Sequence, residues 1–320
     1  MNRSVLNVRL GSQMRVVSPL ALGLLLALPM GTFAAGIPAA VSADPPQDRV
    51  HPAGMLPFGL PTHGIKINAV LYTAAGQGSH PTVLLLHGIP GNEQNLDLAR
   101  AAQRAGWNVL TLHYRGSWGS PGSYSFTHCL EDAAAAVAWL RDPRSTAAGN
   151  IDRARIVVVG HSLGGFVAAY LAGHDRRLAG AALISATRYL GAPLPGVTRA
   201  ELIQVWEAEI MNRAGMHTLG DATAVALAEE SISHSADWDL KQFAPVLAEH
   251  PLLVVSSEDG AAASNERIAT AVEGQPNAKV TRVHFMTDHS YNDQRIALTT
   301  ALLSWLSSFV GNDADGRSSP

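Results

Sequence analysis

Short apolar runs rich in β-branched residues recur along the middle of the chain, and turn-forming or polar residues separate them. Such runs are typical of strands that are buried on both faces of a parallel sheet. Strands of this kind are predicted at Thr82–His87, Trp107–Tyr114, Ile156–Val159, Ala179–Ala186 and Pro251–Gly260. Two other segments, Ile65–Tyr72 and Lys279–Met286, alternate apolar and polar residues, and the first is predicted to be an edge strand.

Helical patterns lie between these strands. Apolar residues recur at three- and four-residue steps in 130–140 and again in 298–309, which marks one buried stripe of a helix in each segment. Helices are also expected over Gln94–Ala105 and from Gly165 onward. Strand and helix alternate about every 20 to 30 residues, and this alternation predicts an α/β fold: a doubly wound, mostly parallel sheet with helices on both faces.

The alternation stops between residues 187 and 250, a length far greater than a crossover in such a sheet needs. Thr198 and Glu201 form a capping box that opens a helix. The predicted apolar face of that helix consists of Leu202, Val205, Trp206 and Ile210. A second helix is expected near Asp221, and it is predicted to bury Val225, Ala228 and Ile232. We interpret 187–250 as a helical cap insertion; a helical decoration that packs elsewhere is the alternative.

The two ends of the chain differ from this body. Three arginines precede the uncharged apolar run Val16–Met30, and small residues follow it, which predicts a signal peptide over 1–43 with cleavage near Val41–Ala43 or Thr32–Ala34. The expected location is secreted or periplasmic, with no stable membrane span after cleavage; an uncleaved anchor is the alternative. A linker or extended arm over 44–64, a main domain over 65–310 and a flexible tail over 311–320 complete the predicted organisation.

Composition narrows the possible functions. Hydrophobic residues make up 47% of the 320 residues, which is ample for a large core. The net charge is −3 and no basic stripe is present, so a nucleic-acid partner is not expected. Cys129 is the only cysteine, which argues against an internal disulfide or a zinc–cysteine framework, and it is interpreted as buried filler. No metal-binding motif is present, and no cofactor is predicted.

The segment Ile156–Gly165 contains the strongest chemical signal. Its buried strand ends in Gly160-His161-Ser162-Leu163-Gly164, which matches G-x-S-x-G, and a helical composition follows at once. A strand that reverses into a helix within a few residues needs a sharp turn, and small residues on either side of the serine let neighbouring backbone pass close to it. This context predicts that Ser162 is a nucleophile, whereas the same motif elsewhere can be an ordinary turn.

A nucleophilic serine needs a base, and the base needs a third group that holds it in one tautomer. Asp259 follows one predicted strand and His289 follows the next, so both belong at the same sheet edge as Ser162. Their order along the chain is the one expected on a doubly wound sheet. Glu258 is an alternative acid, and Asp288 is interpreted as a turn or cap residue. The other histidines near these segments are predicted to have structural roles.

Taken together, HGIPG (87–91), YRGSWGSPGSYS (114–125), GHSLGG (160–165), the aspartate after SSE and the DHS (288–290) make the chain resemble an α/β-hydrolase over residues 82–309. The resemblance is to compact bacterial serine hydrolases related to prolyl oligopeptidase and dienelactone hydrolase, although relatives of the latter have cysteine at the elbow. It implies that His289 acts as general base and then general acid, and that Asp259 orients it. It also implies an oxyanion hole formed by the backbone N–H groups of Ile89 and Leu163.

These observations predict a serine hydrolase that cleaves a carboxylic ester, or an amide, through an acyl-enzyme. A serine aminopeptidase, an acyltransferase and a catalytically silent binding protein are the alternatives. The expected partner is a small ester or acyl substrate; the oligomeric state is not predicted. Trp206, Ile210 and Trp238 are candidates for an apolar acyl pocket, but the same residues at helical spacing are also typical of a core.

Overall fold

The computed structural model describes residues 36–187, 190, 198–211 and 218–310. The chain forms two compact units, Met1–Gly36 and Ile37–Pro320, and all described residues except Gly36 belong to the second. The greater part of the predicted signal peptide and the whole predicted tail lie outside the described residues. Among those that are described, no helix combines the length and the hydropathy that a membrane span requires.

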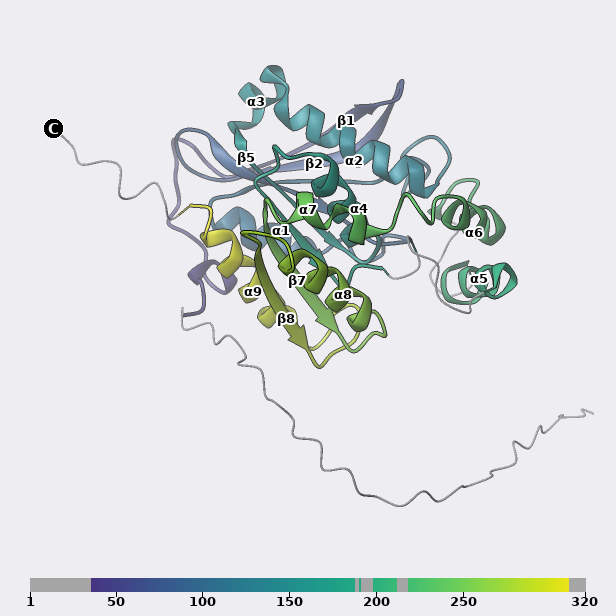
Figure 1. The fold of residues 1–320 in the computed structure, drawn as a ribbon. Coiled ribbons are helices and arrows are strands. Elements are labelled where there is room, and N and C mark those ends of the chain that lie inside the picture. Colours follow the sequence, from purple (N-terminus) through teal and green to yellow (C-terminus); the bar gives the residue numbers. More distant parts are fainter. Residues whose placement is uncertain (1–35, 188–189, 191–197, 212–217, 311–320) are drawn as a thin grey trace, which may run out of the picture. The chain divides into compact units, whose positions relative to one another are not determined.

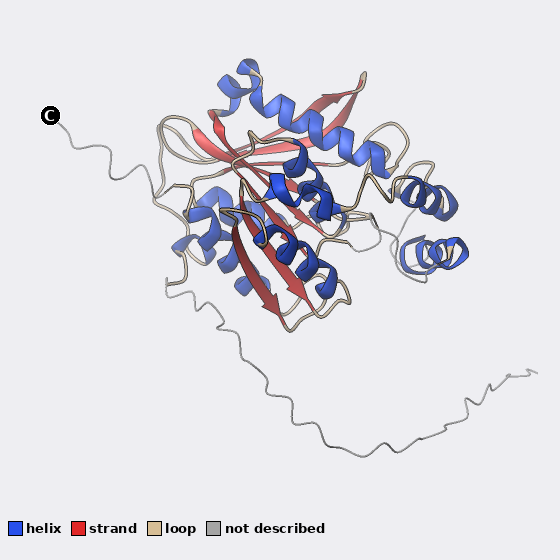
Figure 2. Ribbon diagram, viewed as in Figure 1, coloured by secondary structure: helices blue, strands red, loops and turns tan. Residues whose placement is uncertain are grey.

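A single sheet of eight strands forms the centre of the second unit (Figures 1 and 2). In spatial order the strands are β1 (Gly54–Thr62), β2 (Ile65–Thr73), β4 (Asn108–Leu112), β3 (His80–Leu86), β5 (Ile151–His161), β6 (Gly180–Ile184), β7 (Pro251–Ser257) and β8 (Lys279–Phe285). The strands from β4 to β8 are parallel, whereas β1 and β2 are antiparallel to their neighbours. This arrangement confirms the predicted doubly wound, mostly parallel sheet.

Strand β1 corrects two predictions. Residues 54–62 form a strand that pairs with β2 along its whole length, so this part of the predicted arm belongs to the sheet and β2 is not an edge. His63 and Gly64, both with positive φ, make the two-residue turn between the strands. Pro57 and Pro61 give the segment an irregular composition, but an edge strand tolerates proline because half of its N–H groups need no ladder partner.

Helices cover both faces of the sheet (Figure 2). One face packs against α2 (Phe126–Arg141), α4 (Leu163–His174) and α8 (Ala262–Glu273), and the other against α1 (Leu96–Arg104) and α9 (Arg295–Ser307). The short helix α3 (Pro143–Gly149) follows α2. Successive residues of β5 face opposite sides: Val158 belongs to the first core cluster, and Val157 and Val159 belong to the second. Burial on both faces is therefore the reason for the continuous apolar runs.

The segment between β6 and β7 contains both predicted helices: α5 (Arg199–Val205), which continues into a π-helical turn η2 (Trp206–Met211), and α6 (Ala224–Ser233). It also contains η4 (Leu240–Phe243) and α7 (Ala244–Leu247), which the sequence analysis did not predict. The capping box of Thr198 and Glu201 is confirmed. The predicted inner face of α6 is partly wrong: Val225 and Ile232 are 45% and 40% exposed. With Thr223 as N-cap, the helix instead turns Leu227, Ala228 and Ser231 inward, at three- and four-residue steps.

Candidate active site

Ser162 lies in a sharp turn between β5 and α4. Its backbone has φ 58° and ψ −119°, a strained conformation for a residue with a side chain. The flanking glycines make the turn possible: a Cβ on Gly160 would lie 1.9 Å from the Gly164 oxygen, and a Cβ on Gly164 would lie 2.1 Å from the Leu86 oxygen. No L side chain fits at either position, so the glycines of the motif are explained by close backbone packing.

The carboxyl ends of β7 and β8 supply the proposed acid and base. Asp259 Oδ2 accepts a hydrogen bond from His289 Nδ1 at 2.7 Å. The Asp259 side chain is 3% exposed, whereas that of His289 is 44% exposed. Burial acts to raise the pKa of Asp259, but hydrogen bonds from His289, the Ala261 N–H and the Ser185 hydroxyl together lower it to about 2. An ionised Asp259 therefore holds the proton on Nδ1 of His289 and leaves Nε2 as the basic nitrogen.

His161 connects the base to the turn that carries Ser162. The rings of His161 and His289 lie 4.7 Å apart, and His161 Nε2 donates to the backbone oxygen of His289 at 2.7 Å. Burial lowers the pKa of His161 to about 3, so this imidazole is neutral. The residue next to Ser162 thus holds the His289 loop at the same sheet edge. The sequence predicts a structural role for His161 but not this partner.

The two competing carboxylates make other contacts. Glu258 is exposed and its Oε1 lies 2.8 Å from Nε2 of His284, whose Nδ1 lies 2.9 Å from the Ser256 hydroxyl. Asp288 accepts hydrogen bonds from the backbone N–H groups of Ser290 and Asn292, as a turn residue does. The geometry therefore favours Asp259 as the partner of His289, and the roles of both residues remain predictions.

Buried hydroxyl groups support Asp259 from behind, and the sequence did not reveal them. Ser185 Oγ lies 2.8 Å from the Tyr291 hydroxyl and 3.0 Å from Ser257 Oγ, and all three side chains are buried. Burial raises the pKa of Tyr291 to about 12, so its hydroxyl keeps its proton and can donate. No motif marks these residues; their only signal is that each lies just beyond, or at the end of, a strand at this edge.

The predicted oxyanion hole lies beside Ser162. A Cβ on Gly88 would be 2.9 Å from Ser162 Cβ, so the backbone before Ile89 is in contact with the serine. Leu163 begins α4, and a first-turn N–H has no acceptor within its own helix. His87 Nδ1 bonds to the Gly88 oxygen at 2.7 Å, and because a peptide is planar and its N–H and C=O point in opposite directions, this bond also fixes the Ile89 N–H.

Trp118 links this loop to the insertion 187–250, called the cap below, although its position over Ser162 stays a prediction. Its indole Nε1 donates to the Pro90 oxygen at 2.6 Å, and its backbone N–H donates to the Thr218 oxygen at 3.1 Å. Its φ of 47° is unusual for a bulky residue. A bridge between Ser117 and Leu219 continues the same contact between loop and cap. Through these contacts Trp118 braces the loop that contains Pro90.

A second contact joins the cap to the body at the start of α2. The Glu230 carboxylate, on α6, accepts the backbone N–H groups of Phe126 at 2.8 Å and Thr127 at 2.7 Å. Both are first-turn donors without a partner inside α2, and the negative charge also complements the helix dipole. Sequence reasoning missed this interaction, because Glu230 and Phe126 are far apart along the chain.

The structure describes two of the three candidate pocket residues in full and the third only in part. Trp206 and Trp238 are 1% and 3% exposed and belong to the hydrophobic core, where both rings contact Phe126. Their clear contribution is to pack the insertion 187–250 against Phe126 of α2, and a contact with substrate remains a prediction. Ile210 lies in the π-helical turn, but its side chain is outside the described residues.

Comparisons with known proteins agree with this architecture. Residues 81–206 match the model of the alpha/beta hydrolase fold family. An uncharacterised Mycobacterium tuberculosis protein is 34% identical over 129 residues, which are 40% of this chain and 44% of that protein. Lysophosphatidylserine lipase ABHD12 of Danio rerio is 30% identical over 119 residues, 36% of this chain and 29% of the lipase. The chain thus matches less than half the length of these relatives.

Solved structures show the same fold. The thermostable carboxylesterase EstE1, from a metagenomic library, has a TM-score of 0.58 at 24% identity, with 80% of this chain and 90% of EstE1 covered. Est1E of Butyrivibrio proteoclasticus, with ferulic acid bound, has a TM-score of 0.62 at 16% identity, with 79% and 99% covered. The narrower resemblance to the prolyl oligopeptidase and dienelactone hydrolase group stays a prediction. With its eight-stranded sheet, its serine turn and the match over 81–206, the chain has the α/β-hydrolase fold.

Proposed function

We propose that this protein is a serine hydrolase that cleaves carboxylic esters through an acyl-enzyme. The observation that supports it best is the 2.7 Å hydrogen bond between His289 and the buried Asp259, on a loop held against the strained turn of Ser162. Esterases among the structural neighbours, and a lipase among the relatives, are consistent with this reaction. Amide hydrolysis and acyl transfer would use the same groups.

The proposed reaction has two halves. Ser162 Oγ attacks the ester carbonyl carbon while His289 Nε2 accepts the hydroxyl proton, and the carbonyl oxygen becomes an anion that the N–H groups of Ile89 and Leu163 stabilise. When the C–O bond breaks, His289 returns the proton to the departing alcohol. Water then attacks the acyl-enzyme with its proton going to His289, and His289 returns that proton to Ser162 Oγ as the bond to the acyl group breaks and the acid leaves.

Replacing Ser162 by alanine tests the mechanism. We expect a loss of about a million-fold in kcat for p-nitrophenyl esters, the size seen when such a nucleophile is removed. A fluorophosphonate should label the natural protein and not this variant. Ser307→Ala, an exposed serine on α9, is the matched control and should behave like the natural protein. Unchanged hydrolysis by Ser162→Ala would overturn the mechanism, and absence of labelling in the natural protein would favour a silent binding protein.

A substrate comparison separates the proposed esterase from its enzymatic alternatives. Short p-nitrophenyl esters should be cleaved with a higher kcat/KM than aminoacyl p-nitroanilides of similar size. Preference for the anilides would support an aminopeptidase instead. Product analysis with an added alcohol would reveal an acyltransferase, because the acyl group would pass to the alcohol rather than to water.

We also propose that the protein is exported and that its signal peptide is cleaved at Thr32–Ala34, the more N-terminal of the two predicted sites. Residues Ala39–Val41 form the 3-10 turn η1, and Arg104 Nε, on α1, donates to the Ala40 oxygen at 2.9 Å. Cleavage after Ala43 would remove this contact with the folded body, whereas cleavage near Ala34 would keep it. Mass spectrometry of the mature protein from the periplasm or medium tests this, and an uncleaved N-terminus would contradict it.

A further inference from the structure

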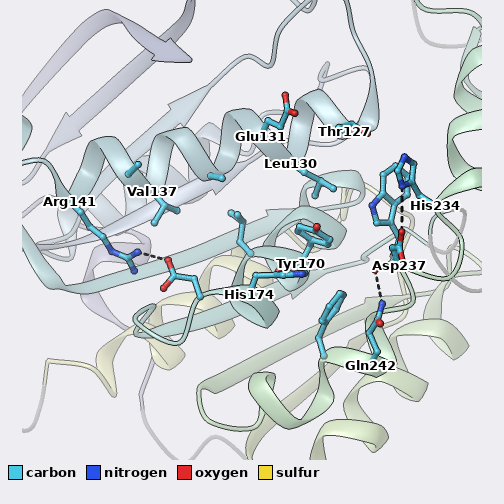
Figure 3. A pocket seen from close by; sticks show the side chains of 16 residues that line it. Thr127, Leu130, Glu131, Val137, Arg141, Tyr170, His174, His234, Asp237 and Gln242 are labelled. Atoms are coloured by element: carbon cyan, nitrogen blue, oxygen red, sulfur yellow. Dashed lines mark hydrogen bonds and ion pairs between the residues drawn. The ribbon is translucent and has the colours of Figure 1, made fainter. Parts of the chain in front are cut away.

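A hollow that Ser162 does not line lies between two helices on one face of the sheet. This α2–α4 groove, of about 900 Å³, runs between α2 and α4 and is closed on one side by residues 234–243 (Figure 3). Its volume is within the range of small-molecule sites. Its length along α2, from Thr127 to Arg141, is about 21 Å at 1.5 Å per residue. The groove is therefore long enough for an extended chain.

The surfaces of the groove are mainly apolar. Its floor is formed by Leu130, Val137 and Leu171, which are nearly buried, and the small exposed residues Ala134 and Ala138 leave the space above it open. Aromatic rings form the opposite wall: Tyr170 and Phe243 have ring centroids 5.6 Å apart, and Trp238 continues the wall. Such a channel favours an aliphatic chain, because each methylene that leaves water contributes about 0.8 kcal/mol.

One end of the groove meets a basic pocket. Arg141 lines the groove and also a neighbouring hollow of about 560 Å³, together with Ser79, Arg153 and Arg177. These residues come from separate segments that meet at the amino ends of the parallel strands. These three arginines outnumber the two carboxylates beside them, Asp152 in the same hollow and Asp175 on Arg141.

The arginines retain hydrogen-bonding capacity. Arg141 forms an ion pair with Asp175 through Nη1, while its Nε and Nη2 are buried and meet no acceptor among the described residues, so a head group reaches them only if this side chain moves. Arg153 and Arg177 are exposed, and their side chains form none of the hydrogen bonds or ion pairs found in that part of the chain. The one carboxylate of the basic pocket, Asp152, is already paired with Arg155 at 2.6 Å. Guanidinium groups with free donors bind carboxylates and phosphates well.

We propose that the α2–α4 groove and the basic pocket together bind a single-chain amphiphile with an anionic head group. The alkyl chain lies along α2 on Leu130 and Val137, and the head group lies among Arg141, Arg153 and Arg177. Arg153 is nine residues before Ser162 on β5, about 30 Å away at 3.3 Å per residue. The head-group end of the site is thus far from Ser162, whereas Trp238, a candidate for the acyl pocket, lines the other part of the groove.

Titration calorimetry on the full-length protein tests the head-group charge and the alkyl-chain length of the ligand separately. Each ligand is used below its critical micelle concentration. Octanoate, dodecanoate and dodecyl phosphate should bind, with an affinity that rises with chain length; dodecyltrimethylammonium and inorganic phosphate should bind at least tenfold more weakly. The better of dodecanoate and dodecyl phosphate identifies the head group. Equal binding of the cationic amphiphile, an affinity independent of chain length, or no binding at all would overturn the proposal.

Two variants locate the bound molecule. The double variant Arg153→Ala/Arg177→Ala should weaken dodecanoate binding about tenfold or more, whereas Arg176→Ala should change it less than twofold, because Arg176 pairs with Glu249 outside both hollows. Ala134→Phe fills the groove at an exposed position and should abolish the dependence on chain length. Thermal unfolding confirms that each variant is folded. Unchanged dodecanoate binding by the double arginine variant would place the molecule elsewhere and overturn the proposal.

Discussion

The serine turn and the cap differ in what holds them in place. Around Ser162, backbone atoms approach so closely that an added Cβ at Gly160 or Gly164 would overlap them. The cap is instead joined to the body by separate polar contacts, such as those of Glu230 and Trp118, together with the packing of Trp206 and Trp238 on Phe126. A change in the serine turn should therefore affect every substrate, whereas a change in a cap contact should mainly affect which substrate binds. The variants below test this difference.

The largest expected effect concerns the acid. Asp259→Asn removes the charge that holds His289 in the productive tautomer, and kcat should fall about ten-thousand-fold, as when the corresponding residue is changed in a well-studied triad. Glu258→Gln, the adjacent carboxylate, is the control and should change kcat less than threefold. Steady-state kinetics of both variants with one ester shows which of the two carboxylates is the acid. If Glu258→Gln had the larger effect, the assignment of the acid would be wrong.

Acid should lower the free energy of unfolding through two buried histidines near the serine turn. Burial lowers the pKa of His161 to about 3 and that of His87 to about 4, whereas histidine in an unfolded chain titrates near about 6.5. Between these values the unfolded chain binds more protons, so the free energy of unfolding should fall by about 2 kcal/mol for each histidine from pH 7 to pH 5. Asp259, with a pKa of about 2, is ionised at both pH 7 and pH 5 and so does not contribute to this loss.

Urea unfolding at the two pH values measures this loss. His87→Asn keeps a donor for the Gly88 oxygen but cannot titrate, so it should remove about half of the pH dependence. Equal stability at pH 7 and pH 5 in the natural protein would show that these imidazoles are not held neutral by the fold.

Gly164→Ala tests the close packing of the serine turn directly. Its Cβ would lie 2.1 Å from a backbone oxygen of β3, so strand or helix must move, and we expect at least about 3 kcal/mol of destabilisation together with loss of activity. Gly274→Ala is the control, because the nearest atoms are 3.6 Å away, and it should change stability by less than about 1 kcal/mol. A fully stable Gly164→Ala variant would contradict the contrast between the two regions.

These two regions also show where sequence reasoning succeeds. The buried strands, the serine turn and the positions of Asp259 and His289 after β7 and β8 could be predicted because local rules decide them: continuous apolar runs, glycines around a strained residue, and polar residues beyond strand ends. The partners of Glu230 and Ser185 could not be predicted, because each lies more than seventy residues away and no local pattern marks it. Strand β1 was missed because its prolines conceal a hairpin that depends on pairing with β2.

Trp118→Phe tests whether the cap reaches the oxyanion loop. Phenylalanine keeps the ring but cannot donate to the Pro90 oxygen, so the loop that presents the Ile89 N–H becomes less well fixed. Removing an oxyanion donor outright costs about 100-fold or more, and misplacing one should cost less, about tenfold in kcat with little change in KM. Trp139→Phe, on the far side of α2 and stacked on Phe58, is the control. A change in KM alone would assign Trp118 to substrate binding instead.

The smallest expected effect is at the far attachment of the cap. Glu230→Gln removes the negative charge from the start of α2 and leaves one of the two N–H groups without its acceptor, which should cost about 1 kcal/mol. Because Glu230 lies outside the serine turn, kcat should stay within twofold while KM for a bulky ester rises about fivefold. Glu229→Gln, an exposed neighbour paired with Arg199, is the matched control. Hydrogen exchange should show faster opening of α6 only in Glu230→Gln. If kcat fell as much as KM rose, the cap and the serine turn would not be the separable parts that their contacts indicate.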